Sequence, residues 1–495
     1  MPLPDPRGAG RFHYAGLGGS GMSALAQFQV MSGGRASGSD RAFDRGERRE
    51  ARQQLERLGI SIHPQDGSGV AGDCAALVVS TAVEETVPDV GAAKARGIPI
   101  VHRSELLAHF VASFRTIAVT GTSGKSTAVA MVFEVLHALG RRPSVITGGD
   151  LELLRARGLQ GNAWYGGSDL LVVEADESDG SVVRYTPAIG VVLNLQRDHK
   201  EMSEVARMFE VFRRQTREAF VVGEAENLAP LSAGAIVFGF GPRAEVRGSS
   251  LALGPESSQF EVDGTRFSLP VPGEHNVEDA LAAIATCREL GVAFAEMARP
   301  LESFRGVGRR FQSIGTARGV EVVDDFAHNP AKIEAAIRTA GRRVQHGGDG
   351  RGPSPGRSGV PARPPESAGR VLAIYQPHGY GPTRFLRADF VETFASALDT
   401  EDRLWMLEVY YAGGTAQRDF SAADIVAEIV ARGTRAEFAP SRDWLVDRVA
   451  EEAREGDLVL VMGARDPSLT DLARAILEAV GSRRARAGGV RASGE

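Results

Sequence analysis

Residues 116–127 read TIAVTGTSGKST. The apolar start of this stretch predicts a central β-strand, Thr116–Thr120, that enters a short glycine-rich loop. After the loop, apolar residues recur at three- and four-residue intervals from Val129 to Leu139, which predicts a helix that ends at Gly140. Such a loop turns backbone N–H groups toward one point, at the positive end of the helix dipole. The stretch therefore predicts a phosphate-binding site on a parallel α/β sheet.

The side chains of this loop suit a polyphosphate bound with Mg²⁺. Lys125 is placed to contact the β- and γ-phosphates, and Ser126 to offer its hydroxyl group to the metal ion. The loop is shorter than the full Walker pattern, because Val119 stands where the first glycine would be. The alternative is an ordinary Gly/Ser turn at the start of a helix. The scarcity of lysine weighs against that alternative, because only four of the 57 Lys plus Arg residues are lysine.

Length and composition describe a protein of several domains. The chain has 495 residues, 43% hydrophobic and 24% charged, so about three domains are expected. No apolar run approaches the roughly 18–20 residues of a bilayer span, and no signal peptide is evident, so a cytoplasmic protein is expected. A net charge of −6 without a basic stripe argues against nucleic acid as the main partner. The two cysteines, Cys74 and Cys287, are expected to be buried thiols.

Short Val/Ile/Leu runs alternate with helical stretches, which is typical of doubly wound parallel α/β domains. Three such blocks are expected, at residues 1–113, 114–302 and 303–495. Two segments rich in Gly, Pro, Ser and Arg, residues 345–369 and 481–495, are expected to be disordered because they hold little apolar surface. The expected strands are Phe12–Ala15, Ser61–His63, Ala76–Ser80, Ile98–Val101, Thr116–Thr120, Leu170–Val173, Ile189–Leu193, Val320–Asp324, Val371–Tyr375, Arg403–Leu407 and Leu458–Val461. The expected helices include Met22–Met31, Glu50–Leu58, Ser104–Phe110 and Val277–Thr286.

Two further motifs follow predicted strands. The first, LVVEADESD at residues 171–179, places carboxylates at the end of an apolar strand, where ligands bind in open α/β sheets. Glu174 supplies the oxygen ligand that Mg²⁺ prefers, and the alternative is a solvated acidic loop. The second, NLQRDH at residues 194–199, ends in His199. This histidine is a candidate for a second Mg²⁺ site or a γ-phosphate contact, and the alternative is a structural histidine.

A second kind of glycine loop, GLGGSG at residues 16–21, follows the first predicted strand, and Asp40 stands roughly twenty residues later. By itself this pattern is typical of dinucleotide binding, and a nicotinamide dehydrogenase is one hypothesis. The chain shows no evident hydride-transfer site, however. Two phosphate loops in one chain suggest one nucleotide as the energy source and another as a handle on the substrate.

The chain as a whole resembles the Mur ligase family, the ATP-dependent amide-forming ligases of peptidoglycan synthesis, and within it the branch that adds L-alanine to UDP-N-acetylmuramate. The resemblance covers nearly the whole chain. It rests on motifs that follow in the family's order, namely GLGGSGMSALA, GSD, VVSTAV, GIPIVHRSELLA, TGTSGKST, EADESDGS, NLQRDH, GEHNVEDALAA, RRFQ, DDFAHNP and YQPHGYGPTR. It implies a Rossmann-like UDP-substrate-binding domain at 1–113, a central P-loop ATPase domain at 114–302 and a Rossmann-like C-terminal domain at 303–495.

The resemblance also implies roles for individual residues. Ser126 or Thr127 would bind Mg²⁺ with Glu174, and His199 would bind a second Mg²⁺. His328 would face the incoming amino acid. The candidate catalytic residues are Lys125, His199 and His328. The residues expected to bind ATP are Gly121, Thr122, Ser123, Gly124, Lys125, Ser126, Thr127, Asn276, Arg310 and Asp325. The residues expected to bind the UDP-substrate are Gly16, Gly18, Gly19, Ser20, Gly21, Asp40 and Ser80.

The implied reaction uses ATP to convert a carboxylate into an acyl phosphate, which an amine then attacks. The expected partners are small molecules, namely a UDP-sugar acid, an amino acid and ATP, with Mg²⁺ as the metal cofactor. No nucleic acid or membrane partner is expected, and the chain would act as a monomer or a homodimer.

Several positions depart from the alanine-adding branch. Ser123 stands where that branch usually has histidine, and Gly379 and Pro382 stand where it usually has arginines. Arginine binds a carboxylate bidentately, so Arg384 or Arg465 would have to replace that function. These departures leave open a paralogue that uses another amino acid, a peptide or a different acid, of which the murein-peptide recycling ligase is one example. A nucleotide-binding protein that has lost catalysis is a further hypothesis.

Overall fold

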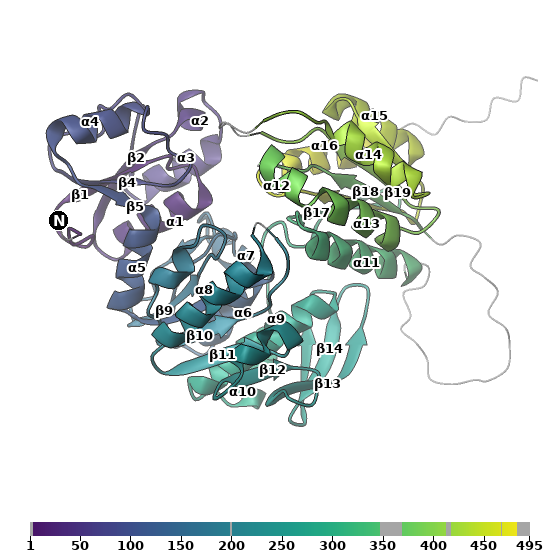
Figure 1. Ribbon diagram of the computed structural model, residues 1–495, viewed down its shortest axis with the longest axis horizontal. Helices are drawn as coiled ribbons and strands as arrows, with labels where there is room; N and C mark the ends of the chain where they lie inside the picture. The colour runs from purple at the N-terminus through teal and green to yellow at the C-terminus, as the bar shows by residue number, and fades with distance from the viewer. Residues whose placement is uncertain (1–2, 199, 347–368, 412–416, 467, 483–495) are drawn as a thin grey trace, which may run out of the picture. The chain divides into compact units, whose positions relative to one another are not determined.

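The chain folds into three α/β sheets that lie in two compact units (Figure 1). The computed structural model describes residues 3–198, 200–346, 369–411, 417–466 and 468–482. The first unit holds Met1–Leu253 and Ser257–Gly308, and the second holds Gly254–Glu256 and Arg309–Glu495. Two of the sheets belong to the first unit and the third belongs to the second.

The first sheet is entirely parallel, with the strand order β3-β2-β1-β4-β5. Its strands are β1 (Arg11–Ala15), β2 (Arg35–Ser39), β3 (Ser61–His63), β4 (Cys74–Val79) and β5 (Ile100–His102). Its helices are α1 (Ser20–Met31), α2 (Arg41–Asp44), α3 (Arg49–Arg57), α4 (Pro88–Arg96) and α5 (Arg103–Ser113). The strand order reverses at β1, and ligands bind at the carboxyl ends of strands at such a reversal. The loop at residues 16–21, called here the first glycine loop, follows β1 at this point.

The second sheet has the strand order β15-β14-β13-β12-β11-β10-β6-β9-β7-β8. Its strands are β6 (Arg115–Thr120), β7 (Ser144–Ile146), β8 (Ala163–Trp164), β9 (Leu170–Glu174), β10 (Ile189–Val192), β11 (Ala219–Gly223), β12 (Ile236–Gly239), β13 (Val246–Leu253), β14 (Ser258–Val262) and β15 (Thr265–Leu269). Its helices are α6 (Lys125–Ala138), α7 (Glu152–Arg155), α8 (Met202–Gln215), α9 (Glu274–Glu289) and α10 (Phe294–Glu302), with short 3₁₀ helices η1 (Ser181–Arg184) and η2 (Glu226–Leu231). β6 lies between β9 and β10, all three parallel, so the segments that follow these strands meet at one edge.

The core of the first unit runs without a break from the first sheet into the second. Along β6, Ile117 packs on one face with α6 and α9, while Ala118 packs on the other face in a cluster that includes α1, α5 and α8. Phe28 of α1 meets Phe110 of α5 edge to face, with ring centroids 5.0 Å apart. The same ring lies 6.0 Å from that of Tyr165, which follows β8. Helix α1 therefore packs against elements of both sheets.

The third sheet has the strand order β16-β17-β21-β18-β19-β20, with only β16 antiparallel to its neighbour. Its strands are β16 (Gln312–Ala317), β17 (Val320–Asp325), β18 (Val371–Tyr375), β19 (Arg403–Leu407), β20 (Ala436–Ala439) and β21 (Leu458–Met462). Its helices are α11 (Pro330–His346), α12 (Tyr380–Phe385), α13 (Arg387–Ala397), α14 (Ala422–Ala431), α15 (Arg442–Glu452) and α16 (Leu469–Ser482). Alternate side chains of β18 divide between its faces: Ala373 packs with α11, α13 and α14, and Ile374 with α15 and α16.

The structure extends the secondary structure expected from the sequence. Every expected strand is present, with its ends shifted by no more than two residues. The strands that the sequence did not predict include β2 and the β13–β15 ribbon. β2 reads RASGS, and its small buried residues lack the Val/Ile/Leu signal of a buried strand. The β13–β15 ribbon pairs antiparallel at β13–β14 and β14–β15, unlike the parallel strands of the α/β pattern.

Both segments that were expected to be disordered begin with helical residues. Helix α11 continues through residues 345–346 and α16 through residues 481–482, so helical structure extends into both segments. Residues 347–368 and 483–495 lie outside the described residues. Cys74 and Cys287 are buried free thiols, as expected.

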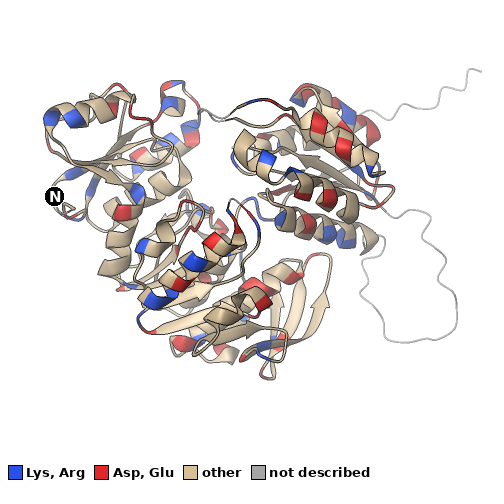
Figure 2. Cartoon of the chain, viewed as in Figure 1, with Lys and Arg blue, Asp and Glu red and all other residues tan. Residues whose placement is uncertain are grey.

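The surface helices carry mixed charge. Figure 2 shows Lys and Arg interspersed with Asp and Glu on helices of both units. Within the described part of the chain, no helix combines the length and apolar composition of a membrane span.

Candidate active site

Three loops meet at the carboxyl edge of the second sheet. The loop at residues 120–127, called here the second glycine loop, follows β6, while the EADESD motif begins at the end of β9 and the NLQRDH motif follows β10. Contacts join these loops across long sequence separations. Lys125 pairs with Glu177, 52 residues away, and Thr122 with Asn194, 72 residues away. The parallel order β9-β6-β10 therefore assembles the three motifs.

Two glycines determine the backbone of the second glycine loop. Gly121 has a φ of 137° and Gly124 a φ of 81°, both in the region that favours glycine. A Cβ atom at Gly124 would lie 2.1 Å from Oδ1 of Asp279, and one at Gly121 would lie 3.0 Å from Cβ of Leu193. Both the backbone angle and the available space therefore require glycine at these positions. Gly124 is also the N-cap of α6, so the loop leads directly into the helix.

Asn194 and Gln196 fix the loop from the β10 side. Oδ1 of Asn194 accepts hydrogen bonds from the Thr122 hydroxyl and the Ser123 backbone N–H, both at 2.9 Å. Its Nδ2 donates to the Ser123 carbonyl oxygen at 3.1 Å. Oε1 of Gln196 accepts from the Ser123 hydroxyl at 2.9 Å, and its backbone N–H donates to the Thr122 hydroxyl at 2.9 Å. Side chains thus preorganise the loop without a ligand.

Lys125 lies among carboxylates at the start of α6. Its Nζ donates to Oε2 of Glu177 at 2.7 Å and to the carbonyl oxygen of Gly121 at 2.9 Å, and lies 3.7 Å from Oδ1 of Asp176. Burial by itself would lower the pKa of Lys125, but the charges of Glu177, Asp176 and Glu174 outweigh burial and raise it. The lysine is therefore held as a cation beside the loop. A charged lysine in this place suits a polyanionic ligand.

Glu174 accepts hydrogen bonds from hydroxyl and amide groups of two segments, the start of α6 and the residues after β7. Its Oε2 accepts from the Ser126 hydroxyl at 2.9 Å, the Thr147 hydroxyl at 2.8 Å and the Gly148 backbone N–H at 2.9 Å. Ser126, and not its neighbour Thr127, is thus the residue that meets Glu174. Carboxylate and hydroxyl oxygens are the ligands Mg²⁺ prefers, and nucleotide-bound Mg²⁺ takes few protein ligands. Among the described residues, no three His, Cys, Asp or Glu side chains lie together in a metal-binding cluster.

The NLQRDH motif also reaches this edge, although His199 lies outside the described residues. Its neighbour Asp198 is buried. The residues that line one narrow hollow beside the second glycine loop are Thr122, Glu177, Ser178, Gln196, Asp198, Lys200 and Val205. The position of His199 in the chain is therefore compatible with the predicted metal or phosphate contact, which stays a prediction.

Asn276 lies in the first turn of α9, which packs along α6. Its Nδ2 donates to the carbonyl oxygen of Pro272 at 2.6 Å, so the side chain closes the turn before the helix. Asp279, three residues later, is the side chain that approaches Gly124. Helix α9 thus lies beside the second glycine loop, and the contact of Asn276 with adenine stays a prediction.

A larger hollow lies away from these motifs. It has a volume of about 480 Å³, and β14, β15 and α10 line it with residues that include Gln259, Glu261, Arg266 and Glu302. None of the sequence motifs falls in it, and its polar side chains include an Arg266–Glu261 ion pair at 3.0 Å. The candidate site is therefore identified by the side chains of the sequence motifs, and not by the volume of the hollow.

The first glycine loop is held mainly by backbone hydrogen bonds. Gly16 and Leu17 donate to the carbonyl oxygen of Ser39 at 2.9 and 3.0 Å. Asp40 follows directly, and its Oδ2 accepts from the N–H of Gly18 at 2.8 Å. Its Oδ1 accepts from the N–H of Ala42, so Asp40 also caps α2. Asp40 therefore contacts the first glycine loop, and its role in binding the UDP-substrate stays a prediction.

The other predicted residues of this loop lie at the same end of the sheet. Gly19 is the N-cap of α1, and Ser20 and Gly21 form its first turn. Ser80 follows β4, the neighbour of β1, and a Cβ at Gly16 would lie 3.6 Å from the Val83 side chain of that segment. The structure therefore groups the predicted UDP-substrate residues at one sheet edge.

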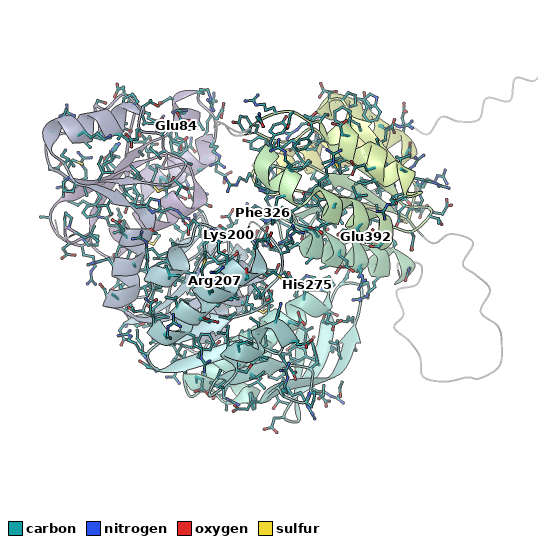
Figure 3. The ribbon with its side chains drawn as sticks, in the orientation of Figure 1. Glu84, Lys200, Arg207, His275, Phe326 and Glu392 are labelled. Atoms are coloured by element: carbon teal, nitrogen blue, oxygen red, sulfur yellow. The ribbon has the colours of Figure 1, made fainter. Side chains whose placement is uncertain are left out.

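In the second unit, Arg310 and Asp325 lie close together. Asp325 ends β17, and its carboxylate accepts from the N–H groups of Phe311 at 2.6 Å and Ala327 at 2.7 Å. Burial raises the pKa of Asp325, and the Arg310 guanidinium opposes this shift. Arg310 lies over the ring of Phe326, 4.7 Å from its centroid; Figure 3 labels Phe326.

His328 follows in the same segment. Its Nδ1 lies 2.8 Å from the carbonyl oxygen of Phe326 and therefore carries the proton that is donated to it. Nε2 is then the acceptor, and it lies 3.4 Å from Nζ of Lys332. The ring of His378 lies 5.4 Å from that of His328. The second unit thus places two imidazoles and one amine together after β17 and β18.

Family models match the chain in three consecutive regions. The Mur ligase family, catalytic domain, matches residues 11–115, the Mur ligase middle domain matches 119–287, and the Mur ligase, glutamate ligase domain, matches 309–349 and 362–465. The chain belongs to the Mur ligase family. It is therefore an ATP-dependent acid–amino-acid ligase that acts on small molecules, and the dehydrogenase hypothesis is wrong.

Relatives within the Mur ligases match almost the full chain. The UDP-N-acetylmuramate–L-alanine ligase of Pelotomaculum thermopropionicum is 33% identical over 472 residues, covering 92% of this chain and 94% of the relative. That of Thermobifida fusca is 33% identical over 492 residues, covering 95% and 97%. The crystal structure of the UDP-N-acetylmuramate-alanine ligase of Thermotoga maritima matches with a TM-score of 0.73 at 26% identity, covering 95% of this chain and 98% of that one. The murein peptide ligase of Psychrobacter arcticus shares the fold, with a TM-score of 0.67 at 18% identity.

One departure of this Mur ligase in the second unit, Gly379, has a backbone conformation that favours glycine. Gly379 has a φ of 68° and precedes α12 as its N-cap, so arginine would be strained in this backbone. Arg384 pairs with Asp419 and lies over the ring of Phe420, 5.5 Å from its centroid. Arg465 is exposed. Of the two predicted replacements, Arg384 is thus already engaged by a carboxylate.

Sequence reasoning missed several residues of this Mur ligase's site. Thr147 directly follows β7, a three-residue strand, and belongs to no recognisable motif. Asn194, Gln196 and Glu177 lie inside the NLQRDH and EADESD motifs, but their partners lie in the second glycine loop, so spacing alone could not assign them. Lys332 is one of only four lysines in the chain, and this scarcity was the signal that could have found it.

Proposed function

We propose that this Mur ligase joins L-alanine to the carboxyl group of UDP-N-acetylmuramate and converts ATP to ADP and phosphate. One observation carries the proposal: Lys125, Ser126 and Glu174 converge at one sheet edge of a chain whose curated relatives, matched over more than nine-tenths of it, bear that name. The first glycine loop would hold the UDP part of the acid, and the second glycine loop would hold ATP.

The chemistry begins with activation of the acid. A carboxylate has no good leaving group, so an amine does not displace oxygen from it directly. An oxygen of the carboxylate attacks the γ-phosphorus of ATP, ADP leaves, and an acyl phosphate forms. Lys125 and the N–H groups at the start of α6 would offset the charge on the transferring phosphoryl group. Mg²⁺, held by Ser126 and Glu174, would neutralise phosphate charge.

The amine of the amino acid then attacks the carbonyl carbon of the acyl phosphate. Phosphate leaves with the oxygen that came from the carboxylate, and the amide remains. Arg310 and Asp325 are the nucleotide-binding candidates of the second unit, and His328 is the residue that would face the amino acid. His328 would take up the amine proton at Nε2, and Lys332, whose Nζ lies 3.4 Å from that atom, would have to move away first.

A second candidate is a Mur ligase with the same chemistry and a different amino acid or peptide. The conformation of Gly379 and the pairing of Arg384 with Asp419 favour it, because both remove an expected carboxylate-binding arginine. Lys332 beside His328 offers a cation of different geometry. This candidate changes the acceptor and leaves the role of the second glycine loop unchanged.

The test is ADP release with UDP-N-acetylmuramate and each of the twenty amino acids in turn. Turnover with L-alanine above all others supports the proposal. Turnover with another amino acid selects the second candidate. ADP release with none of them, from a protein that still binds ADP by calorimetry, contradicts both.

A further inference from the structure

The two glycine loops belong to different sheets, yet side chains join them. Asn162 precedes β8 of the second sheet, and its Nδ2 donates to the carbonyl oxygen of Ser20 at 2.9 Å and to the hydroxyl of Ser23 at 3.0 Å. Its Oδ1 accepts from Gln27 on the next turn of α1 at 2.8 Å. Asn162 is 2% exposed and Gln27 is fully buried. A buried amide with three such bonds holds the first turn of α1 in one place.

The same residue leads to the second glycine loop. The backbone carbonyl oxygen of Asn162 accepts from the N–H of Thr147 at 3.0 Å. The Thr147 hydroxyl donates to Glu174 at 2.8 Å, and Glu174 accepts from Ser126 at 2.9 Å. A continuous path of hydrogen bonds therefore runs from Ser20 at the first glycine loop to Ser126 at the second.

A second path reaches the opposite side of the second glycine loop. Arg103 begins α5, and its Nη2 donates to Oδ2 of Asp179 at 2.5 Å, with side chains 25% and 12% exposed. The guanidinium lies against the first turn of α1, because a Cβ at Gly21 would lie 2.7 Å from Nη1. Asp179 belongs to the loop that carries Glu177, and Glu177 pairs with Lys125. This path therefore ends at the lysine, as the first ends at the serine.

We propose that Asn162 and the Arg103–Asp179 pair are positioning residues that keep the first glycine loop aligned with the second. The inference rests on the proposed function, in which the acid held by one loop attacks the phosphate held by the other. Attack requires the two reacting atoms to meet in a narrow range of distance and angle, and a misplacement of about 1 Å costs roughly 10²-fold in rate. Two paths that end on both flanks of the phosphate site would fix that distance and angle.

The chain offers a matched control for the second path. Glu105 and Arg184 also join α5 to the segment after β9, with N and O atoms 3.6 Å apart. Both side chains are about half exposed, at 49% and 52%, and the pair has the opposite polarity to Arg103–Asp179. An exposed pair of this kind contributes little to stability. Arg184→Ala therefore removes an ion pair between the same elements without touching either glycine loop.

The first experiment compares turnover with binding. Asp179→Asn keeps the shape of the side chain and removes its charge, and we expect a fall of about 10-fold to 100-fold in kcat, with the Kd values for ADP and the UDP-sugar acid within about 3-fold of wild type. Asn162→Ala is expected to behave likewise, and Arg184→Ala to keep kcat within about 2-fold. Asp179→Glu should recover part of the kcat that Asp179→Asn loses.

Two results of this experiment would overturn the inference. Unchanged kcat in Asp179→Asn would show that the charge pair positions nothing. A raised Kd for the UDP-sugar acid, with kcat at saturation unchanged, would show that the Arg103–Asp179 pair serves substrate binding and not positioning.

A second measurement separates this inference from the proposed function. Hydrogen exchange follows the amides of residues 20–24 in wild type and in Asp179→Asn, with Mg²⁺ and ADP as the added ligand. ADP is expected to slow exchange there in wild type and not in the variant. If this coupling is present but no amino acid supports turnover, the proposed function fails and the inference stands. If turnover is normal but the coupling is absent, the inference fails alone.

Discussion

The first and second glycine loops have the same local architecture, but they differ in the groups that hold them and in the charged side chains they carry. Each leads from a buried parallel strand into the N-terminus of a helix, at the point where the strand order reverses. The first glycine loop is held by backbone bonds to Ser39 and by the Asp40 carboxylate. The second is held by Asn194 and carries Lys125 among carboxylates. In the proposed function, both loops bind a phosphate group through strand, loop and helix N-terminus, and the charged side chains of the second loop serve phosphoryl transfer.

The largest effect expected from this difference is the loss of turnover in Lys125→Ala. We expect ADP formation to fall by about 10³-fold or more, because no other cation in the loop offsets the charge on the transferring group. Binding of the UDP-sugar acid, measured by calorimetry, should be unchanged. Lys94→Ala, which removes an exposed lysine paired with Glu85, is the control and should keep full activity. Substantial ADP formation by Lys125→Ala would contradict the assignment of the transferring loop.

The second prediction concerns the glycines of the two loops. Gly124→Ala should destabilise the protein by about 1–3 kcal/mol and weaken ADP binding by at least about tenfold, because φ is positive and Asp279 occupies the space. Gly140→Ala at the other end of α6 has a similar φ of 72° and open space, so it measures backbone strain alone. Gly19→Ala in the first loop, with φ of −68°, should be nearly neutral. Equal effects of all three on ADP binding would refute this account.

The third prediction concerns Asp40. In wild type, the Asp40 carboxylate accepts the Gly18 N–H. Asp40→Asn replaces one of the carboxylate oxygens with an NH₂ group, so the first glycine loop should be held less firmly. We expect the KM for the UDP-sugar acid to rise about fivefold to tenfold and the KM for ATP to stay within about twofold. Steady-state kinetics with each substrate varied in turn measure both. A rise in the KM for ATP alone would show that the loops are not divided in function as proposed.

The fourth prediction is a pH dependence of stability that belongs to one helix. Helix α1 buries the uncharged Gln27 and Gln29, whereas α6 buries Glu134. Burial raises the pKa of Glu134 to about 7, with the Arg305 N–H opposing the shift. Because the folded pKa lies above the unfolded one, this group's contribution to stability is full below about pH 4.5 and is lost as the pH rises through 7. The loss reaches about 3 kcal/mol at most.

Glu134→Gln should therefore remove part of the fall in Tm between pH 5 and pH 8. The amide oxygen of glutamine can still accept the Arg305 N–H, so the variant isolates the charge. The shift is expected to be a few degrees at pH 8 and close to zero at pH 5. Calorimetry at both pH values measures it. An identical pH dependence in wild type and variant would mean that Glu134 is not the titrating group.

The parts of the fold that the sequence predicted are those with strong local patterns. Thr116–Thr120 is mainly apolar and leads into a glycine loop and a helix with a periodic apolar pattern. The local sequence alone therefore predicts this strand, loop and helix. β2 was missed because its buried positions are serine, glycine and alanine, which fit close beside the first glycine loop. There a Cβ at Gly38 would lie 2.7 Å from the Tyr14 carbonyl oxygen.

The residues of the candidate site also divide into those that local sequence patterns predicted and those that they did not. The sequence predicted that Ser126 and Glu174 would meet, because both follow apolar strands of one sheet. It did not predict Asn162 or Thr147, because their roles depend on the pairing of β7 with β8 and on the contact of α1 with the second sheet. Pairings of that kind are set by tertiary packing and leave no periodic signal in the sequence.

In the proposed mechanism, the sugar acid is activated as an acyl phosphate at the second glycine loop. The most direct measurement uses UDP-N-acetylmuramate labelled with ¹⁸O in its carboxyl group, the amino acid that supports turnover, and mass spectrometry of the released phosphate. If the carboxylate attacks the γ-phosphorus and phosphate later leaves with that oxygen, the phosphate will contain one ¹⁸O atom for each amide formed. Unlabelled phosphate accompanying amide formation would contradict the account.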